Sequence, residues 1–178
     1  MRKSKLILLW IALLFSGAAF GQLDLNAPMP VDKSIRIGKL DNGLTYYIRK
    51  NAMPEKRIEL RLAVNAGSMQ ETDAQVGLAH FTEHICFNGT KNFPKNELVS
   101  YLQSIGVRFG ADINAYTGFD ETVYMLQIPS DKTDIVEKGY QVIADWAHAV
   151  TMEAKQIDDE RGVIIEEYRM GLGADDRM

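Results

Sequence analysis

The amino-acid sequence predicts an α+β fold, in which helices pack on a mostly antiparallel sheet. Apolar residues alternate with a period of two in segments that lie both before and after the first helical segments. Two of these segments flank residues 41–43, whose Asn-Gly supplies the positive φ of a tight hairpin turn. The resulting order of strands, helices, hairpin and helices is typical of this fold class.

The first half of the chain is predicted to contain three strands and one helix. A polar, proline-containing lead-in covers residues 22–33, and a hairpin covers residues 34–50. Alternating residues predict a third strand over residues 57–64. After a loop, the pattern predicts a helix over residues 74–87, with Gly89 as its stop.

A second helix is predicted to have Pro94 in its first turn, where proline is tolerated. Leu98, Leu102 and Ile105 follow at i, i+4 and i+7 and form its apolar face. Gly106 is the predicted end of this helix.

A second hairpin and a long helix come next. Residues 113–117 and 122–129 are the predicted strands, and Gly-Phe-Asp-Glu between them is the turn. Thr133 or Asp134 is expected to cap the long helix. Four apolar residues of this segment are predicted to face inward: Val136, Ile143, Trp146 and Val150.

The last predicted helix covers residues 156–170, with Gly171 as its stop. The chain ends just past it, and no strand follows to complete the sheet. We therefore expect residues 34–178 to form one domain that is incomplete at its C-terminus, as a piece of a longer protein.

The composition is that of a globular protein. Of the 178 residues, 46% are hydrophobic and 25% are charged, which argues against disorder. The net charge is −4, and no basic cluster follows the N-terminal segment. Both observations argue against a nucleic-acid partner.

Residues 1–21 are predicted to be a signal peptide. Three basic residues precede an apolar run at residues 6–15, and small residues follow up to Gly21. The alternative is an uncleaved anchor or a buried N-terminal helix, but the flanks and the length of the run favour cleavage. We expect an exported protein, periplasmic or secreted, without a stable membrane anchor after cleavage. No lipobox-like cysteine directly follows the run, so a lipid anchor is not indicated.

Cys86 is the chain's single cysteine, so an internal disulfide is excluded. In its apolar surroundings it is expected to pack as a small hydrophobic residue. A nucleophilic role beside two histidines is the weaker alternative.

His80, Glu83 and His84 stand out because they lie in an otherwise apolar helical segment. The two histidines are one helical turn apart on one face, which is the spacing of two ligands of one metal ion. Glu83 is three residues from His80 and is better placed to contact a metal-bound water as a general base. The alternative is a pair of surface histidines on a solvated helix, and the apolar neighbours count against it.

A third ligand must come from elsewhere in the chain. His148 is the remaining histidine, and a partly exposed helical position is the better reading for it. Glu160 and Glu167 fall on one helix face with Val163 and Ile164, so two carboxylates interleave with aliphatic residues. The other acidic residues of this helix fit a solvated surface. The pattern therefore offers Glu160 and Glu167 as the candidates.

Three segments resemble the pitrilysin/insulinase family of metallopeptidases, the inverzincins. "HFTEHICFNGTKNFP" looks like the family's inverted zinc motif and the loop that follows it. "INAYTGFDETVYML" is similar to its Asn-Ala-Tyr/Phe-Thr segment, and "ERGVIIEE" resembles the element that holds its distal glutamates. The resemblance covers about residues 35–170.

The resemblance implies a role for each candidate residue. His80, His84 and Glu167 would be the ligands of one zinc ion per chain, and Glu83 the catalytic base. Glu160 would be a supporting carboxylate beside the ligands. Two further residues match the strand that lines the substrate cleft and pairs with extended peptide: Asn114 and Ala115.

The family's fold is a clamshell of repeated units with the zinc site in the first, so residues 34–178 would be its zinc-binding part. The resemblance implies a zinc-dependent endopeptidase that hydrolyses peptides or small unfolded proteins through a metal-activated water. Further domains of the same protein, or a partner subunit, would close the chamber. The alternatives are a non-catalytic subunit or binding module of the same fold, or an inactive fragment of the peptidase.

Overall fold

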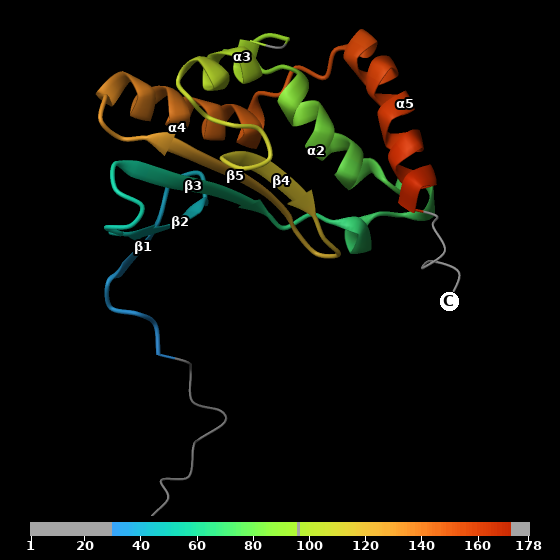
Figure 1. Ribbon diagram of the computed structural model, residues 1–178. Helices are drawn as coiled ribbons and strands as arrows, with labels where there is room; N and C mark the ends of the chain where they lie inside the picture. Colours follow the sequence, from blue (N-terminus) through green and yellow to red (C-terminus); the bar gives the residue numbers. More distant parts are fainter. Residues whose placement is uncertain (1–29, 96, 172–178) are drawn as a thin grey trace, which may run out of the picture. The chain divides into compact units, whose positions relative to one another are not determined.

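The computed structural model describes residues 30–95 and 97–171 and divides the chain into two units, residues 1–51 and 52–178 (Figure 1). The predicted signal peptide and most of the lead-in lie outside the described residues. Within the described part, no helix is long and apolar enough to cross a membrane.

The first unit contains the predicted hairpin. Strands β1 (Ile35–Lys39) and β2 (Thr45–Arg49) pair in antiparallel fashion, with Ile35 opposite Arg49. Gly43 has a φ of +92°, and the Asn42 side chain accepts a hydrogen bond from the Leu44 backbone N–H at 3.1 Å. The turn prediction for residues 41–43 is thereby confirmed.

The second unit is built on a three-stranded antiparallel sheet in the order β3-β5-β4. The strands are β3 (Arg57–Val64), β4 (Ile113–Thr117) and β5 (Thr122–Pro129), which confirms the three predicted segments. β3 pairs along its whole length with β5, so the central strand comes from the second predicted hairpin. β4 is an edge strand of this sheet.

Four helices complete the described part of the second unit, and the α+β prediction is confirmed. They are α2 (Leu78–Asn88), α3 (Glu97–Ser104), α4 (Thr133–His148) and α5 (Ala154–Gly171). Two 3-10 turns, η1 (Ser68–Gln70) and η2 (Asp73–Gln75), precede α2. α2 and α5 contact each other, and α4 packs on β3 and β5 (Figure 1).

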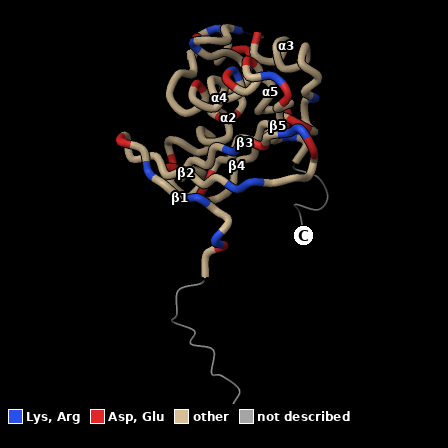
Figure 2. The backbone as a smooth tube through the Cα atoms, turned by 90° about the vertical axis from the view of Figure 1, so that its left-hand side faces the viewer, with Lys and Arg blue, Asp and Glu red and all other residues tan. Residues whose placement is uncertain are grey.

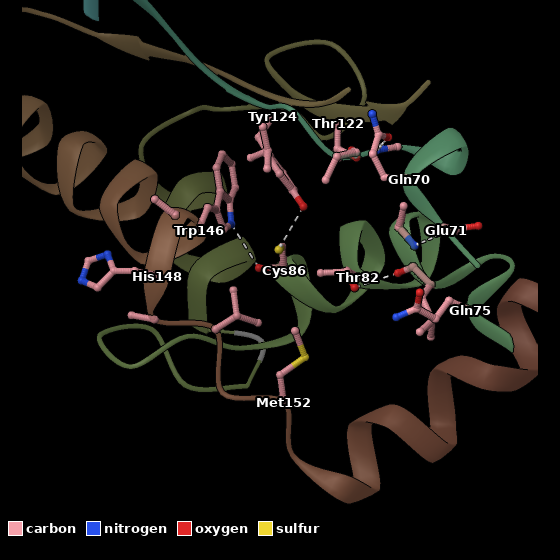
Figure 3. A pocket seen from close by; sticks show the side chains of 18 residues that line it. Gln70, Glu71, Gln75, Thr82, Cys86, Thr122, Tyr124, Trp146, His148 and Met152 are labelled. Carbon is pink, nitrogen blue, oxygen red and sulfur yellow. Dashed lines mark hydrogen bonds between the residues drawn. The ribbon is translucent and has the colours of Figure 1, made fainter. Parts of the chain in front are cut away.

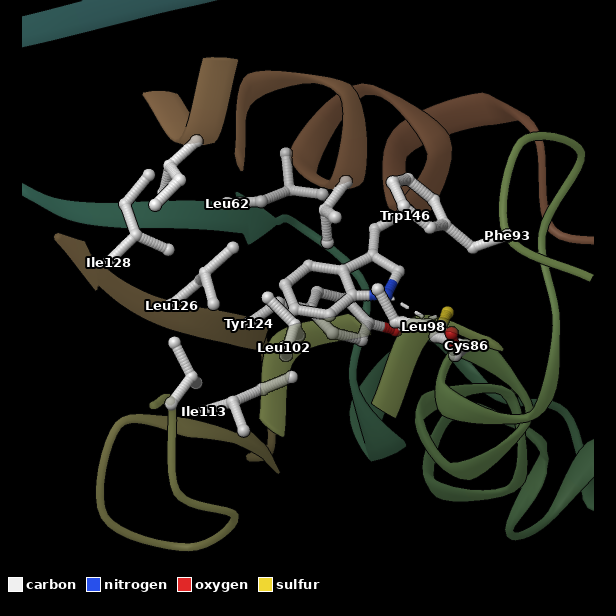
Figure 4. Close-up of a cluster of buried hydrophobic side chains, with 13 residues drawn as sticks. Leu62, Cys86, Phe93, Leu98, Leu102, Ile113, Tyr124, Leu126, Ile128 and Trp146 are labelled. Atoms are coloured by element: carbon white, nitrogen blue, oxygen red, sulfur yellow. Dashed lines mark hydrogen bonds between the residues drawn. The ribbon is translucent and has the colours of Figure 1, made fainter. Parts of the chain in front are cut away.

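The core lies between the sheet and helices α2, α3 and α4 (Figure 4). Alternate residues of β5, Tyr124, Leu126 and Ile128, point into it, as the period of a strand requires. The Trp146 indole N–H donates to the Cys86 carbonyl at 3.1 Å, which joins α4 to α2. Cys86 is 2% exposed and belongs to the core, as predicted.

The predicted starts of the first two helices are wrong. α2 begins at Leu78 rather than residue 74, because Gly77 has a φ of +88° and interrupts the helix after η2. α3 begins at Glu97, three residues after Pro94, whose carbonyl accepts the Glu97 N–H at 3.1 Å. Gly89 is the C-cap of α2, as predicted.

The predicted cap of α4 is also wrong. Lys132 occupies the N-cap position and its side chain makes no capping hydrogen bond. The buried row of α4 differs from the predicted one, since Val136, Ile143 and Val150 are only half-buried and Trp146 alone is buried as expected. A Cβ at Gly139 would lie 2.3 Å from Ile128 Cδ1. The close approach at this glycine turns a different row toward the sheet: Ile135, Gly139, Val142, Asp145 and Trp146.

α5 begins two residues earlier than predicted, and Gly171 is still helical at the end of the described residues. Glu160, Ile164 and Glu167 are half-buried along one face, whereas Val163 is 46% exposed and does not share it. Basic and acidic residues follow each other along the exposed side of α5 (Figure 2), where Lys155 Nζ lies 2.6 Å from Asp159 Oδ2. That side is solvated, as expected.

Candidate metal centre

The histidine helix α2 is anchored at both ends. At its N-terminus the Glu71 carboxylate accepts hydrogen bonds from the Gly77 N–H at 2.8 Å and the Ala79 N–H at 2.7 Å. A negative group at this end also interacts favourably with the helix dipole. At the other end Gly89 terminates the helix, and its carbonyl accepts the Thr151 N–H at 3.2 Å from the segment that leads into α5. The helix is thereby fixed relative to α5.

His80 and His84 lie one turn apart and face α5. Their ring centroids are 4.7 Å apart, and the ring planes are nearly perpendicular. α5 brings Glu167 to the same point: its Oε2 is 3.6 Å from His80 Nε2 and 3.4 Å from His84 Nε2. One donor atom from each of the three residues lies within 4.8 Å of the others.

This donor set fits zinc. Ligand atoms at about 2.0–2.2 Å from a tetrahedral zinc ion lie about 3.3–3.5 Å apart, close to the separations of Glu167 from both histidines. Imidazole nitrogen and carboxylate oxygen are ordinary zinc ligands, and a three-residue set leaves one position for water or substrate. The side chains of His80 and Glu167 are 42% and 40% exposed, so the site is open to solvent.

Glu160 orients one histidine. Its Oε1 lies 2.8 Å from His84 Nδ1, and since a carboxylate accepts, this nitrogen carries the proton. Nε2, the nitrogen beside Glu167, then has a free lone pair that could bind a metal ion. Asn88 Nδ2 donates to Glu160 Oε2 at 2.7 Å and fixes the other carboxylate oxygen. Asn88 was not predicted from the sequence, in which nothing connects it to a residue on α5.

Glu83 is buried, with 8% of its surface exposed. It is on the same helix as the two histidines, adjacent to His84. Thr117 Oγ1, at the end of β4, donates to Glu83 Oε2 at 2.6 Å. Thr117 was not predicted from the sequence, in which it lies 34 residues after Glu83.

Asn114 and Ala115 lie in the edge strand β4. Asn114 pairs with Met125 and Ala115 with Tyr124 of β5. The Ala115 N–H donates to the Asn114 side-chain oxygen at 2.9 Å, so it points to the edge away from β5. This edge can accept an extended peptide by backbone hydrogen bonds.

Cys86 and His148 are not part of the group formed by His80, His84 and Glu167. Burial raises the pKa of the Cys86 thiol to about 11, and its Sγ lies 3.3 Å from Tyr124 Oη. The thiol is therefore protonated at neutral pH, which agrees with its packing role. His148 is exposed at the end of α4, as expected.

A cavity of about 520 Å³ lies beside α2 (Figure 3). Ala79, Thr82 and Cys86 contribute to its wall, together with Trp146 and His148. The two metal-site histidines and Glu83 do not line it. The cavity is therefore separate from the group formed by His80, His84 and Glu167.

The sequence matches the insulinase family (peptidase family M16) over residues 46–171. It is 44% identical over 162 residues to a probable zinc protease, PqqL, of Haemophilus influenzae, covering 90% of this chain and 18% of that protein. A more distant relative is subunit 1 of the bovine mitochondrial cytochrome b-c1 complex, at 32% identity over 75% of this chain and 26% of the relative. Relatives thus include both proteases and complex subunits.

The fold is also similar to a solved structure. The crystal structure of the first half of the periplasmic protease PqqL from Escherichia coli matches with a TM-score of 0.80 and 42% identity. The match covers 84% of this chain and 32% of that one. This chain therefore spans a minor part of the length of the Haemophilus influenzae PqqL and of the crystallised first half of the Escherichia coli PqqL.

Proposed function

Since the chain belongs to the insulinase family, peptidase family M16, we propose that it is the zinc-binding part of a zinc-dependent endopeptidase. The proposed substrates are peptides or small unfolded proteins. The observation that carries the proposal is the convergence of His80 Nε2, His84 Nε2 and Glu167 Oε2 from two helices on one point.

We assign a distinct task to each side chain at this site. His80, His84 and Glu167 would hold one zinc ion, which supplies a Lewis acid and lowers the pKa of a water molecule. Glu83 accepts a proton from the attacking water and later delivers it to the leaving amine. Glu160 keeps the proton of His84 on Nδ1, so that Nε2 stays available as a ligand.

The edge of β4 is the proposed substrate platform. Ala115 presents its backbone to an extended peptide, and the Asn114 side chain, which now covers the Ala115 N–H, would move to contact the peptide. Further domains of the same protein, or a partner subunit, would close the chamber around the substrate. We place the protein in the periplasm or outside the cell, which agrees with the periplasmic location of the PqqL relative.

A non-catalytic subunit of the same fold is the second candidate. The relative in the cytochrome b-c1 complex favours it. The intact His80, Glu83 and His84 motif favours the peptidase.

Peptide cleavage by the native protein and by Glu83→Gln tests the proposal. Because glutamine cannot accept the proton, we expect Glu83→Gln to abolish hydrolysis while zinc stays bound. A chelator should abolish wild-type cleavage, and zinc should restore it. Unchanged turnover in Glu83→Gln would refute the base assignment. A zinc-loaded native protein that cleaves no peptide would favour the subunit. Cleavage by the native protein but not by the isolated 178-residue chain would identify the latter as an inactive fragment.

A further inference from the structure

Among the polar side chains at the candidate metal site, Glu83 is the one that most needs a hydrogen-bond partner. It is buried, whereas His80 and Glu167 are half-exposed to water. A buried carboxylate loses its hydrogen bonds to water, and hydrogen bonds from protein groups must replace them. Thr117 provides one at 2.6 Å, which is in the short range of a hydroxyl donating to a charged carboxylate.

The Thr117 hydroxyl donates to Glu83 rather than to the neighbouring Thr122 hydroxyl, because the carboxylate only accepts and is the nearer acceptor. Thr122 lies opposite Thr117 in the β4–β5 ladder, with the two Oγ1 atoms 3.5 Å apart. Thr122 Oγ1 donates to the Ala66 carbonyl at the shorter distance of 2.8 Å. The hydroxyl of Thr117 is therefore directed to Glu83.

The position of this hydroxyl is set by the sheet rather than by the helix that carries Glu83. Thr117 is the last residue of β4, and a β-branched side chain has restricted χ1 rotation. The adjacent turn is held by the loop after β3, since Ser68 N–H donates to the Gly118 carbonyl at 3.1 Å. Gly67 is in close contact there, because a Cβ on it would lie 2.5 Å from the Gly118 oxygen. The donor is thus fixed on a rigid element.

The geometry points to Thr117 as the positioning residue of Glu83, an inference that rests on the function proposed above. Its hydroxyl occupies Oε2 and holds the carboxylate in one orientation. The other oxygen, Oε1, is the one we assign to the water proton. A misplaced base transfers protons poorly, so the hydroxyl contributes to the rate although it does not touch the reacting atoms.

Three variants of the native protein test this role. Thr117→Val keeps the shape and removes the hydroxyl, and Thr117→Ser keeps the hydroxyl. Ser104→Ala is the control, because it removes an exposed hydroxyl in α3 that donates to the Tyr101 carbonyl at 2.6 Å, outside the proposed site. The measurements are kcat and KM for peptide cleavage, zinc content, and crystal structures of the zinc-loaded proteins.

We expect Thr117→Val to lower kcat about 10- to 100-fold, with KM and zinc content unchanged. Its crystal structure should show the Glu83 carboxylate displaced or in several orientations. Thr117→Ser should retain kcat within about threefold, and Ser104→Ala should match the wild type. A wild-type orientation of Glu83 in Thr117→Val would overturn the inference, as would a wild-type kcat or a loss of zinc in that variant. If the native protein cleaves no peptide, the proposed function fails, and the orientation of Glu83 in the two structures still decides the role of Thr117.

Discussion

His84 has a glutamate of α5 beside each nitrogen of its imidazole ring. Nδ1 lies 2.8 Å from Glu160 Oε1, and Nε2 lies 3.4 Å from Glu167 Oε2. The first contact sets the tautomer and orientation of the ring, and the second brings a carboxylate oxygen to the nitrogen that we propose as a zinc ligand. The two glutamates of α5 therefore have different tasks, although they share one helix face.

Replacing these glutamates separates the two tasks. Glu167→Ala removes a proposed ligand and should weaken zinc binding by more than 100-fold, whereas Glu160→Ala should weaken it about 10- to 100-fold. Glu166→Ala is the control, because Glu166 pairs with Arg169 on the exposed side of α5. Zinc affinity is measured by competition with a chelator. If Glu160→Ala loses more affinity than Glu167→Ala, their roles are exchanged.

The spacing of His80, Glu83 and His84 was informative because helical periodicity alone places them near one another. The carboxylates of α5 could be proposed from their place on an aliphatic face. Thr117 and Asn88 could not, because their glutamate partners are 34 and 72 residues away in sequence. A hydroxyl or amide has no local pattern that reveals a partner at such a distance.

At the scale of elements, Asp145 of α4 holds the loop that follows α2. It is 1% exposed and accepts hydrogen bonds from Thr90 Oγ1 at 2.6 Å, Asn92 Nδ2 at 2.7 Å and Gln141 Nε2 at 2.9 Å. Burial would raise the pKa of Asp145, but these hydrogen bonds outweigh it and hold the pKa below its ordinary value. The charged carboxylate therefore joins the C-terminal side of the histidine helix to α4.

This network predicts a pH-dependent stability. A carboxyl group whose pKa is lowered by folding stabilises the protein above its unfolded pKa of about 3.9, and this stability is lost as the pH falls through the lower folded pKa. Asp145→Asn should therefore lower the free energy of unfolding by about 2 kcal/mol at pH 7. The difference from the wild type should shrink below about pH 4.

Urea unfolding of both proteins between pH 2 and pH 8 measures this difference. Asp131→Asn, at an exposed position before α4, is the control and should follow the wild-type curve. An equal difference at pH 2 and pH 7, or none at pH 7, would show that the charge of Asp145 is not the source of stability.

The existence of each element was easier to predict than its boundaries. Periodicity located α2 and α4, but the positive φ of Gly77 moved the start of α2 to Leu78. The inward row of α4 depends on how closely it approaches β5 at Gly139, which is a property of the packed pair. Local patterns do not contain that distance.

At the scale of the whole molecule, the order of segments predicted the α+β class because layered packing of amphipathic elements allows few arrangements. It did not predict that β3 would pair with β5, since long-range strand pairing has no local signal. This pairing makes β5 central and leaves β4 at an edge, with Thr117 directed at Glu83. The sheet thus places a hydroxyl group against Glu83 and leaves β4 with one unpaired edge.

Metal analysis of the purified, correctly folded native protein is the decisive test of the proposed zinc site. The protein is analysed for transition metals, treated with a chelator, dialysed against zinc and analysed again. We expect one zinc ion per chain after dialysis, and none in a variant that lacks His80 and His84. A folded native protein that contains no transition metal and gains none from zinc would contradict this expectation.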